Sequence, residues 1–318
     1  MRTLLNVEDI GDLKQALQSA FEIKKDRFKF KELGKDKTLL MLFFNSSLRT
    51  RLSTQKAAMN LGMNVIVLDV NQGAWKLETE RGVIMDSDKP EHLLEAIPVM
   101  GCYCDAIGVR SFARFENKKT DYEETILNQF IRYSGRPVFS MESATVHPLQ
   151  AFADMITIEE YKKKPVPKVV MTWAPHPKSL PQAVPNSFAQ WAVAMGYEVV
   201  ITQPKGYELE EKFTKGARIE YDQMKALEGA DFVYAKNWSS PKDETYGQIL
   251  SSDRSWTVSE RHMAVTDNAY FMHCLPVRRG MIVTDEVIES PQSLVIPEAA
   301  NREISATVVL KKILEGLK

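Results

Sequence analysis

The feature that most constrains the fold is the alternation of short apolar runs with longer segments of helical periodicity. Four runs in the first half of the chain occupy residues 39–44, 64–69, 105–110 and 137–141. Five runs in the second half occupy residues 168–173, 197–202, 231–236, 269–274 and 293–298. Short buried strands that alternate with helices are typical of parallel sheets covered on both faces. The pattern therefore predicts the α/β class.

The chain is long enough for two domains, since 318 residues exceed the roughly 100–200 residues of a typical domain. Four or five strands in each half predict two doubly wound domains, each with a central parallel sheet. A predicted helix over residues 148–161 leads into the basic segment KKKPVPK. We therefore expect the domains to span residues 1–150 and 151–318.

Composition excludes several classes of protein. The net charge is -1, so we expect no nucleic-acid partner and no acidic-membrane partner. No apolar stretch is long enough for a membrane span or a signal peptide. Three cysteines, Cys102, Cys104 and Cys274, cannot all pair, which favours a reducing compartment and hence the cytoplasm. The five histidines are scattered without ligand spacing, so we expect neither a metal nor another cofactor.

The first polar motif follows the apolar run at residues 39–44. It reads Asn45-Ser46-Ser47-Leu48-Arg49-Thr50-Arg51 and opens a helical pattern. Backbone N–H groups, hydroxyls and guanidinium groups at the start of a helix form an anion site, and arginine suits phosphate. The alternative is a serine N-cap followed by a solvated basic turn.

Further polar residues follow other predicted strands, where ligands bind in sheets of this kind. Arg110 ends one run, and His147-Pro148-Leu149-Gln150 follows the next. His273-Cys274-Leu275-Pro276 closes a later run, and Asn301-Arg302 lies in the last helical segment. Each motif alone is a weak signal, because a single histidine is more often structural. Their order along the chain is far more specific.

This order resembles the aspartate/ornithine carbamoyltransferase family over nearly the whole chain. The family's Ser-Thr-Arg-Thr-Arg loop is matched by the segment that begins at Ser47, with Leu48 in place of the first threonine. Its His-Pro-x-Gln, its ornithine-type His-Cys-Leu-Pro and its late Asn-Arg are intact. The resemblance implies that the final helix, residues 299–318, returns to the first domain.

The resemblance also implies roles for individual residues. Residues that would hold carbamoyl phosphate are Ser47, Leu48, Arg49, Thr50, Trp75, Arg110, His147, Gln150, Cys274, Leu275 and Arg302. Among these, Arg110, His147, Gln150, Cys274 and Arg302 would act on the carbamoyl group. Cations around the carbonyl and the phosphate would stabilise developing charge. Trp75 resembles a loop residue that reaches a neighbour's site, which implies a homotrimer with shared active sites.

The amine substrate is predicted from departures from plain ornithine enzymes. At the position of Lys236, ornithine carbamoyltransferases resemble one another in having an aspartate. That aspartate pairs with the α-ammonium of ornithine. A lysine would repel that ammonium but attract a lone α-carboxylate, as in an acylated ornithine. Glu142 could hold the acylated amide or the δ-amine, and Arg278 follows the catalytic loop. A surface role for Lys236 is the alternative.

The acyl group is predicted from Pro90. Acetylornithine carbamoyltransferases resemble one another in having a glutamate near this position. A glutamate there would repel a succinyl carboxylate, whereas the proline of this chain carries no charge. His176 and Lys178 add positive or switchable character. The sequence therefore favours N-succinyl-L-ornithine, with N-acetyl-L-ornithine as the alternative and free ornithine a remote one. Pro90 could also be the first residue of a helix, and both interpretations can hold together.

Two other classes of function fit the sequence less well. A nucleotide-dependent dehydrogenase also fits two α/β domains, but no Gly-x-Gly-x-x-Gly follows a strand. A non-catalytic protein on the same fold is disfavoured because all the motifs are intact. The expected activity is carbamoyl transfer to the δ-amine of an acylated ornithine, in arginine biosynthesis.

Overall fold

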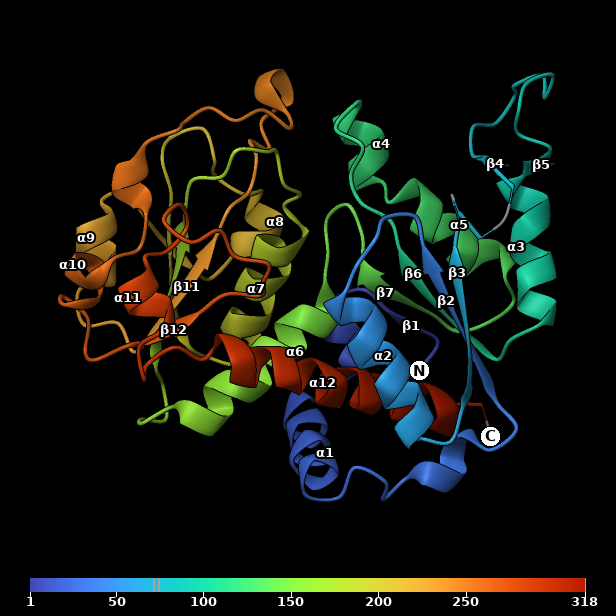
Figure 1. The fold of residues 1–318 in the computed structure, drawn as a ribbon, viewed down its shortest axis with the longest axis horizontal. Coiled ribbons are helices and arrows are strands. Elements are labelled where there is room, and N and C mark those ends of the chain that lie inside the picture. Colours follow the sequence, from blue (N-terminus) through green and yellow to red (C-terminus); the bar gives the residue numbers. More distant parts are fainter. Residues whose placement is uncertain (71, 74, 318) are drawn as a thin grey trace. The chain divides into compact units, whose positions relative to one another are not determined.

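The chain forms two compact units in the computed structural model, which describes residues 1–70, 72–73 and 75–317. One unit comprises Met1–Leu149 together with Arg302–Lys318, and the other comprises Gln150–Asn301. Both junctions fall inside helices, α6 (Pro148–Tyr161) and α12 (Val295–Glu315). The end of the chain therefore belongs to the first unit (Figure 1).

The first unit is built on a five-stranded parallel sheet with the order β1-β7-β6-β2-β3. The strands are β1 (Thr3–Leu4), β2 (Thr38–Phe43), β3 (Asn64–Asp69), β6 (Ala106–Arg110) and β7 (Val138–Glu142). The chain passes from β2 to β3 in one direction and from β6 to β7 in the other. The topological switch point therefore lies between the adjacent strands β2 and β6, where ligands bind in doubly wound sheets.

Helices cover both faces of this sheet. The helices of the unit are α1 (Leu13–Lys25), α2 (Arg49–Asn60), α3 (Leu93–Cys102), α4 (Lys118–Tyr122) and α5 (Thr125–Tyr133). Alternate strand residues such as Leu40 and Leu42 share an apolar cluster with residues of α3 and α5. The second part of α12 lies beside α2, where Asn60 Nδ2 donates to Glu303 Oε1 at 2.7 Å. Two short 3-10 turns (Val7–Ile10 and Lys31–Gly34) and a separate pair of short strands, β4 (Leu77–Glu78) and β5 (Glu91–His92), complete the unit.

The second unit has its own five-stranded parallel sheet, with the order β10-β9-β8-β11-β12. The strands are β8 (Lys168–Trp173), β9 (Glu198–Thr202), β10 (Arg218–Glu220), β11 (Phe232–Lys236) and β12 (Tyr270–Met272). Here the connections diverge from β8 and β11, so the switch point lies between these two strands. Both units confirm the predicted α/β class with doubly wound parallel sheets.

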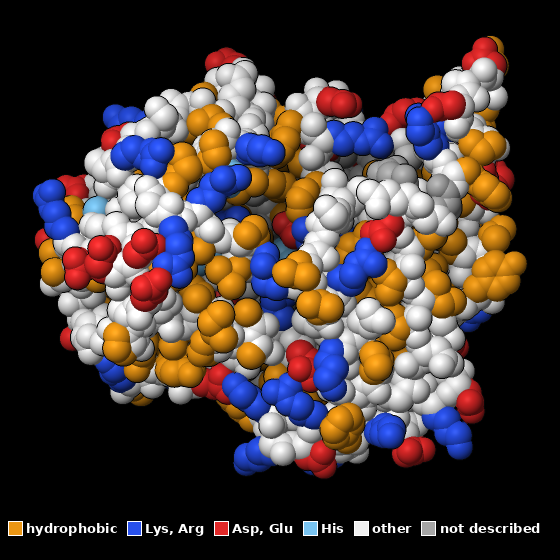
Figure 2. All heavy atoms as spheres, in the orientation of Figure 1, with side chains coloured by type: hydrophobic (Ala, Val, Ile, Leu, Met, Phe, Trp, Pro, Cys, Tyr) orange, Lys and Arg blue, Asp and Glu red, His pale blue; other side chains and the backbone are white. Residues whose placement is uncertain are grey.

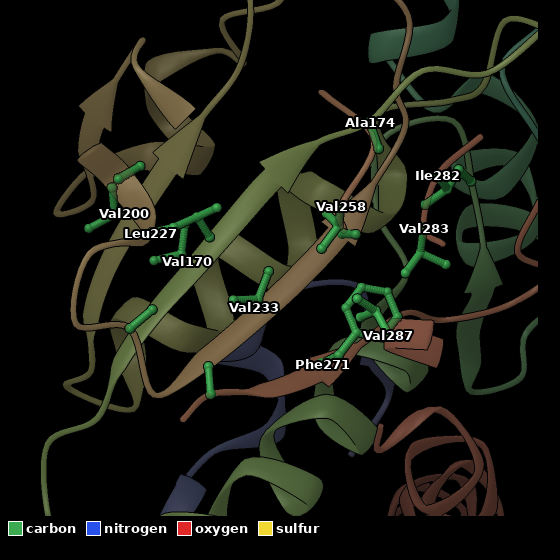
Figure 3. Packing of buried hydrophobic residues seen from close by; sticks show 14 of the residues in the cluster. Val170, Ala174, Val200, Leu227, Val233, Val258, Phe271, Ile282, Val283 and Val287 are labelled. Atoms are coloured by element: carbon green, nitrogen blue, oxygen red, sulfur yellow. The ribbon is translucent and has the colours of Figure 1, made fainter. Parts of the chain in front are cut away.

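The core of the second unit lies on both faces of its sheet. On one face, Val170, Val233 and Phe271 of the sheet pack with Leu227 of α9 (Gln223–Leu227) and Val287 of α11 (Asp285–Ile288), as Figure 3 shows. On the other face, the rings of Phe188, in α7 (Ala183–Ala194), and Tyr234 stack with centroids 4.0 Å apart. The remaining short elements are α8 (Glu211–Thr214), α10 (Glu260–Met263) and the 3-10 turns Asp243–Thr245 and Arg254–Trp256.

One predicted strand is wrong. Residues 293–298 were expected to form a strand, but only Ser293 makes a single bridge to Phe271, and α12 begins at Val295. Pro297 lies in the first turn of this helix, where its missing N–H costs nothing. The apolar run is therefore the buried start of a helix, which periodicity cannot distinguish from a strand over so few residues.

The surface carries both signs of charge. On the face drawn in Figure 2, basic and acidic side chains are interspersed, in keeping with the net charge of -1. Among the described residues, no helix combines the length and the apolar character that a membrane crossing requires.

Candidate active site

The predicted phosphate loop connects β2 to α2 at the switch point of the first sheet. The backbone N–H of Thr50 donates to Ser47 Oγ at 3.3 Å, so Ser47 caps the start of the helix. Asn45 Oδ1 accepts from the N–H of Phe112 at 2.8 Å and thereby joins this loop to the one that follows β6. Leu48 directs an exposed side chain to solvent, so only its backbone is suited to a ligand.

Two arginines approach the buried hydroxyl of Thr50. Arg302 Nη2 donates to Thr50 Oγ1 at 2.8 Å, and Arg110 Nη1 lies 3.4 Å from the same oxygen. All three side chains are almost fully buried. Arg110 also stacks over the ring of Phe112, 4.4 Å from its centroid. Two guanidinium groups at the start of a helix form a strongly anion-attracting site.

Glu142 and His147 complete this cluster. Glu142 Oε2 accepts a hydrogen bond from Arg110 Nη1 and lies 3.5 Å from His147 Nε2. The same histidine nitrogen is 3.4 Å from Arg302 Nη1. Glu142 was predicted to face the amine substrate, and in this state its carboxylate partly neutralises the two arginines. Cations and a carboxylate that share one buried site are held by mutual hydrogen bonds.

Glu124 holds the loop between Glu142 and His147. Its carboxylate accepts hydrogen bonds from Ser143 Oγ at 2.6 Å and from both the backbone N–H (2.7 Å) and hydroxyl (2.5 Å) of Thr145. Burial raises the pKa of Glu124, against these hydrogen bonds, which lower it. Sequence reasoning missed this residue, since nothing in its neighbourhood along the chain marks it.

Arg49 and Arg51 flank Thr50 but differ in their surroundings. Arg51 forms an ion pair with Asp69 at the end of β3, and its guanidinium lies 4.8 Å from the centroid of the Phe43 ring. Arg49, the first residue of α2, is partly buried. Arg51 is therefore tied to the neighbouring strand.

Trp75 and Pro90 lie in a long loop that connects β3 to α3. Trp75 is exposed at 61%, and its indole Nε1 donates to Glu91 Oε2 at 2.7 Å. Pro90 is exposed and immediately precedes β5, so its interpretation as the first residue of a helix is wrong: α3 begins at Leu93. On the other side of Pro90, Lys89 Nζ donates to Glu78 Oε2 at 3.0 Å. Pro90 is therefore held between two anchored residues.

Glu78 fixes the base of the same loop. Its carboxylate accepts from the backbone N–H groups of Thr79 (2.8 Å) and Glu80 (3.0 Å) as well as from Lys89. The Glu80 N–H and the Lys89 ammonium lower the pKa of Glu78 to about 2. Glu78 is thus ionised at neutral pH and holds both ends of the segment that leads to Pro90.

Gln150 and the His-Cys-Leu-Pro segment belong to the second unit. Gln150 Nε2 donates to Asp154 Oδ1 at 2.7 Å and to Glu298 Oε1 at 3.1 Å. Glu298 Oε2 accepts from the backbone N–H of His273 at 2.9 Å. All four residues are buried. Gln150 and the start of the segment are therefore joined through one carboxyl group.

The turn at the end of this segment is conformationally unusual. Leu275 has φ 53°, which is uncommon for a residue with a side chain. Its N–H donates to His273 Nδ1 at 2.8 Å, while Cys274 is buried beside Tyr234. Such backbone strain is concentrated at functional sites, and here it turns the chain within the predicted segment.

Positive groups gather at the switch point of the second sheet. Arg278 Nε donates to His176 Nε2 at 3.1 Å, and His176 Nδ1 lies 2.8 Å from the carbonyl oxygen of Lys178. Burial lowers the pKa of His176, and the charges of Arg278, Lys236 and Lys178 lower it further. Lys236 ends β11, beside β8. A neutral histidine surrounded by cations suits a ligand with carboxylate groups.

The first unit thus brings together Ser47, Thr50, Arg110, Glu142 and His147 with Arg302, which were predicted from separate segments. The second brings together His176, Arg278 and Lys236, and separately Gln150 with the segment at Cys274. Sequence reasoning missed Asp154 and Glu298, although each lies four residues from a predicted residue on a helix, Gln150 and Arg302 respectively. Among the described residues, no group of three or more histidine, cysteine or acidic side chains could hold a metal ion.

Two family models match the chain. Residues 2–160 match the carbamoyl-P binding domain of aspartate/ornithine carbamoyltransferase, and residues 181–313 match its Asp/Orn binding domain. Among curated relatives, N-succinylornithine carbamoyltransferase of Bacteroides fragilis is 78% identical, covering 100% of both chains. N-acetylornithine carbamoyltransferase of Xanthomonas campestris is 38% identical, over 86% of this chain and 87% of the relative.

Solved structures agree with these matches. A variant of N-acetyl-L-ornithine transcarbamylase in which a glutamate is replaced by proline, complexed with carbamyl phosphate and N-succinyl-L-norvaline, superposes with a TM-score of 0.91. It is 35% identical and covers 98% of this chain and 100% of its own. Acetylornithine transcarbamylase complexed with acetylcitrulline also has a TM-score of 0.91, with 34% identity over 98% of this chain and 99% of its own.

Proposed function

Since this chain belongs to the aspartate/ornithine carbamoyltransferase family, we propose that it transfers the carbamoyl group of carbamoyl phosphate to N-succinyl-L-ornithine. The products are N-succinyl-L-citrulline and phosphate, and the reaction belongs to arginine biosynthesis. In this proposal residues 1–150 bind carbamoyl phosphate and residues 151–318 bind the amine. The similarity to a full-length relative, an N-succinylornithine carbamoyltransferase, supports N-succinyl-L-ornithine as the substrate.

The observation that carries the chemistry is the approach of Arg110 and Arg302 to Thr50 at the start of α2. The phosphate would bind to the backbone of residues 47–50, to the hydroxyls of Ser47 and Thr50 and to Arg49. Arg110 and Arg302 would then exchange their present partners for ligand oxygens. Bidentate guanidinium contacts and helix N–H groups suit phosphate.

The transfer needs polarisation more than proton abstraction. The neutral δ-amine attacks the carbamoyl carbon, a C–N bond forms, and the C–O bond to phosphate breaks. The departing phosphate takes up a proton from the amine. Arg110 and His147 would stabilise the negative charge that develops on the carbonyl oxygen, and Gln150 and the carbonyl groups of Cys274 and Leu275 would orient the reacting amide.

The amine would be recognised mainly by its carboxylates. An acylated ornithine carries no α-ammonium, so the cations at the second switch point, Lys236 and Arg278 beside His176, meet only negative charge. Glu142 would accept a hydrogen bond from the acylated amide or the δ-amine once Arg110 turns to the ligand. Like-charge repulsion would disfavour free ornithine at the same site.

Selection of succinyl over acetyl would depend on the loop that carries Pro90. A succinyl group adds a second carboxylate, which a fixed glutamate would repel and a proline does not. A solved relative with glutamate replaced by proline holds N-succinyl-L-norvaline, which accords with this reasoning. The nearest alternative substrate is N-acetyl-L-ornithine.

The test is phosphate release from carbamoyl phosphate with ornithine, N-acetylornithine and N-succinylornithine in parallel. We expect N-succinylornithine to give the highest kcat/KM. Preference for N-acetylornithine would replace the proposed substrate but keep the reaction class. No phosphate release with any of the three amines would refute the proposed activity.

We also propose a cytoplasmic homotrimer in which Trp75 completes a neighbour's site. Support comes from its exposure and from the exposed apolar side chains of Leu48, Leu52 and Met59 on or beside α2. The test mixes two inactive variants, Trp75→Ala and Arg302→Ala, by co-expression. If Trp75 serves a neighbour, some mixed sites contain both native residues and activity returns. If Trp75 serves its own subunit, no site is complete and activity stays absent.

A further inference from the structure

Two carboxyl groups of the second unit are buried without any role in the proposed chemistry. Asp154, in α6, and Glu298, in the first turn of α12, have no solvent exposure. They are hydrogen-bonded to each other, and no lysine or arginine forms an ion pair with Glu298 in the described part of the chain. A buried acid that is not paired with a cation is costly to keep, so the position of Glu298 demands a reason.

The contacts of Glu298 join two sequence motifs. One oxygen accepts from Gln150 Nε2 at 3.1 Å, and the other accepts from the backbone N–H of His273 at 2.9 Å. Asp154 accepts from the same Gln150 nitrogen at 2.7 Å. Both N–H bonds of the Gln150 amide are thereby directed at carboxyl groups. This fixes the plane of the amide, with the oxygen on the opposite side from the acids.

The protonation of the pair favours this arrangement. Burial raises the pKa of Glu298 well above its usual range, and the neighbouring Asp154 and Cys274 raise it further. The pKa of Tyr234, which lies beside Cys274, is also raised well above its usual range, first by burial and then by Asp154. One proton shared between Glu298 and Asp154 avoids two adjacent charges, while oxygen lone pairs remain to accept from Gln150 and His273.

We propose that Glu298, hydrogen-bonded to Asp154, is a positioning residue that aligns the Gln150 amide oxygen and the His273–Pro276 backbone toward the carbamoyl group. This inference rests on the proposed function, since that activity gives Gln150 and the segment a common ligand. Glu298 itself touches no substrate. It acts by fixing the orientation of the groups that do, and misplacement of such groups by about 1 Å costs on the order of 100-fold in rate.

The test compares Glu298→Ala and Glu298→Gln with wild type. The alanine variant should lower kcat by about 100-fold, while the Kd for inorganic phosphate, measured by calorimetry, stays within about twofold because the phosphate loop belongs to the other unit. Glutamine keeps an acceptor for the His273 N–H but replaces the oxygen that accepts from Gln150 with an NH2 group, so it should lower kcat by less than alanine does. A fall in phosphate affinity as large as the fall in kcat would overturn the proposal, as would unchanged kcat in Glu298→Ala.

A double-mutant cycle covers the case in which Glu298→Ala does not fold. Glu298→Gln should cause little further loss of kcat in a Gln150→Ala background, because its effect passes through Gln150. A loss that simply adds to that of Gln150→Ala would overturn the positioning role. The matched control is Glu303→Gln, on the same helix, which removes charge from contacts with Asn60 and Arg27 only and should leave kcat unchanged. Wild-type activity is measured independently, so an inactive wild type would refute the function rather than the positioning.

Discussion

Arg302 donates a 2.8 Å hydrogen bond to the hydroxyl of Thr50, which lies 252 residues earlier in the chain. The contact exists because the second part of α12 packs beside α2 within the first unit. It delivers a cation from the end of the chain to the start of the helix that carries the predicted phosphate loop. Thr50 therefore holds Arg302 in place before any ligand arrives.

Loss of either arginine should abolish most of the activity. Arg110→Ala and Arg302→Ala should each lower kcat/KM by at least about 100-fold, because removal of one positioned donor costs about 3 kcal/mol. Steady-state assays with the preferred amine provide the measurement. Arg27→Ala, which removes a partly exposed ion pair with Glu303, is the control and should behave as wild type. Near-normal turnover in either site variant would exclude that arginine from the site.

Carbamoyl phosphate should raise the melting temperature of the wild-type protein. A ligand present at about 100 times its Kd contributes roughly 2.7 kcal/mol to the free energy of unfolding. Differential scanning fluorimetry at millimolar carbamoyl phosphate measures the shift, with N-succinylornithine absent. The shift should shrink in Arg302→Ala. No shift in the wild type would contradict the assignment of the phosphate loop.

Pro90→Glu should move the preference from N-succinylornithine toward N-acetylornithine. A glutamate facing a succinyl carboxylate at about 4 Å would cost roughly 1–4 kcal/mol, whereas acetyl carries no charge to repel. The ratio of kcat/KM values for the two amines is the measurement. Pro90→Gln is the matched control, since it removes the ring without adding charge. Equal shifts in the two variants would show that the ring, rather than repulsion, sets the preference.

Lys236→Ala should weaken both acylated substrates to a similar extent, because both carry the α-carboxylate. We expect KM to rise about tenfold for each, the loss of a charged hydrogen bond of about 1.5 kcal/mol. Lys178→Ala serves for comparison, because Lys178 is an exposed lysine beside His176. A loss confined to N-succinylornithine would mean that Lys236 binds the succinyl end instead.

Stability should depend on pH through Glu298. Its pKa is raised in the folded protein from the ordinary value of 4.5, so the folded state keeps a proton that the unfolded chain loses. The stabilisation is complete below pH 4.5 and falls by up to about 1.4 kcal/mol per pH unit above it, until the folded pKa is reached. Glu298→Gln lacks this titration. The melting temperature of Glu298→Gln should therefore rise relative to that of the wild type as the pH increases from 5 to 8. Melting temperatures of the two proteins that change in parallel with pH would contradict the prediction.

Much of the fold was predictable because it depends on local pattern. The apolar runs at β2, β3, β6, β7, β8, β9, β11 and β12 fell close to observed strands. Most of these strands are buried on both faces, which requires a continuous apolar run, while β3 is a half-exposed edge strand. Strand β1 has only two residues, and the three residues of β10 are mostly exposed, so neither strand has an apolar run. Residues 293–298 failed because an apolar helix start and a strand look alike over six positions.

The sequence by itself determined which residues we expect to carry the chemistry, because each motif keeps its residue types in a fixed local order. Tertiary structure alone decided which of them meet: Arg302 with Thr50, Glu142 with Arg110, Glu298 with Gln150 and His273. Nothing in the sequence shows that the acids Asp154, Glu298 and Glu124 are buried. Their environment is created by packing, and only packing makes a carboxyl group lose its water and take its hydrogen bonds from distant segments.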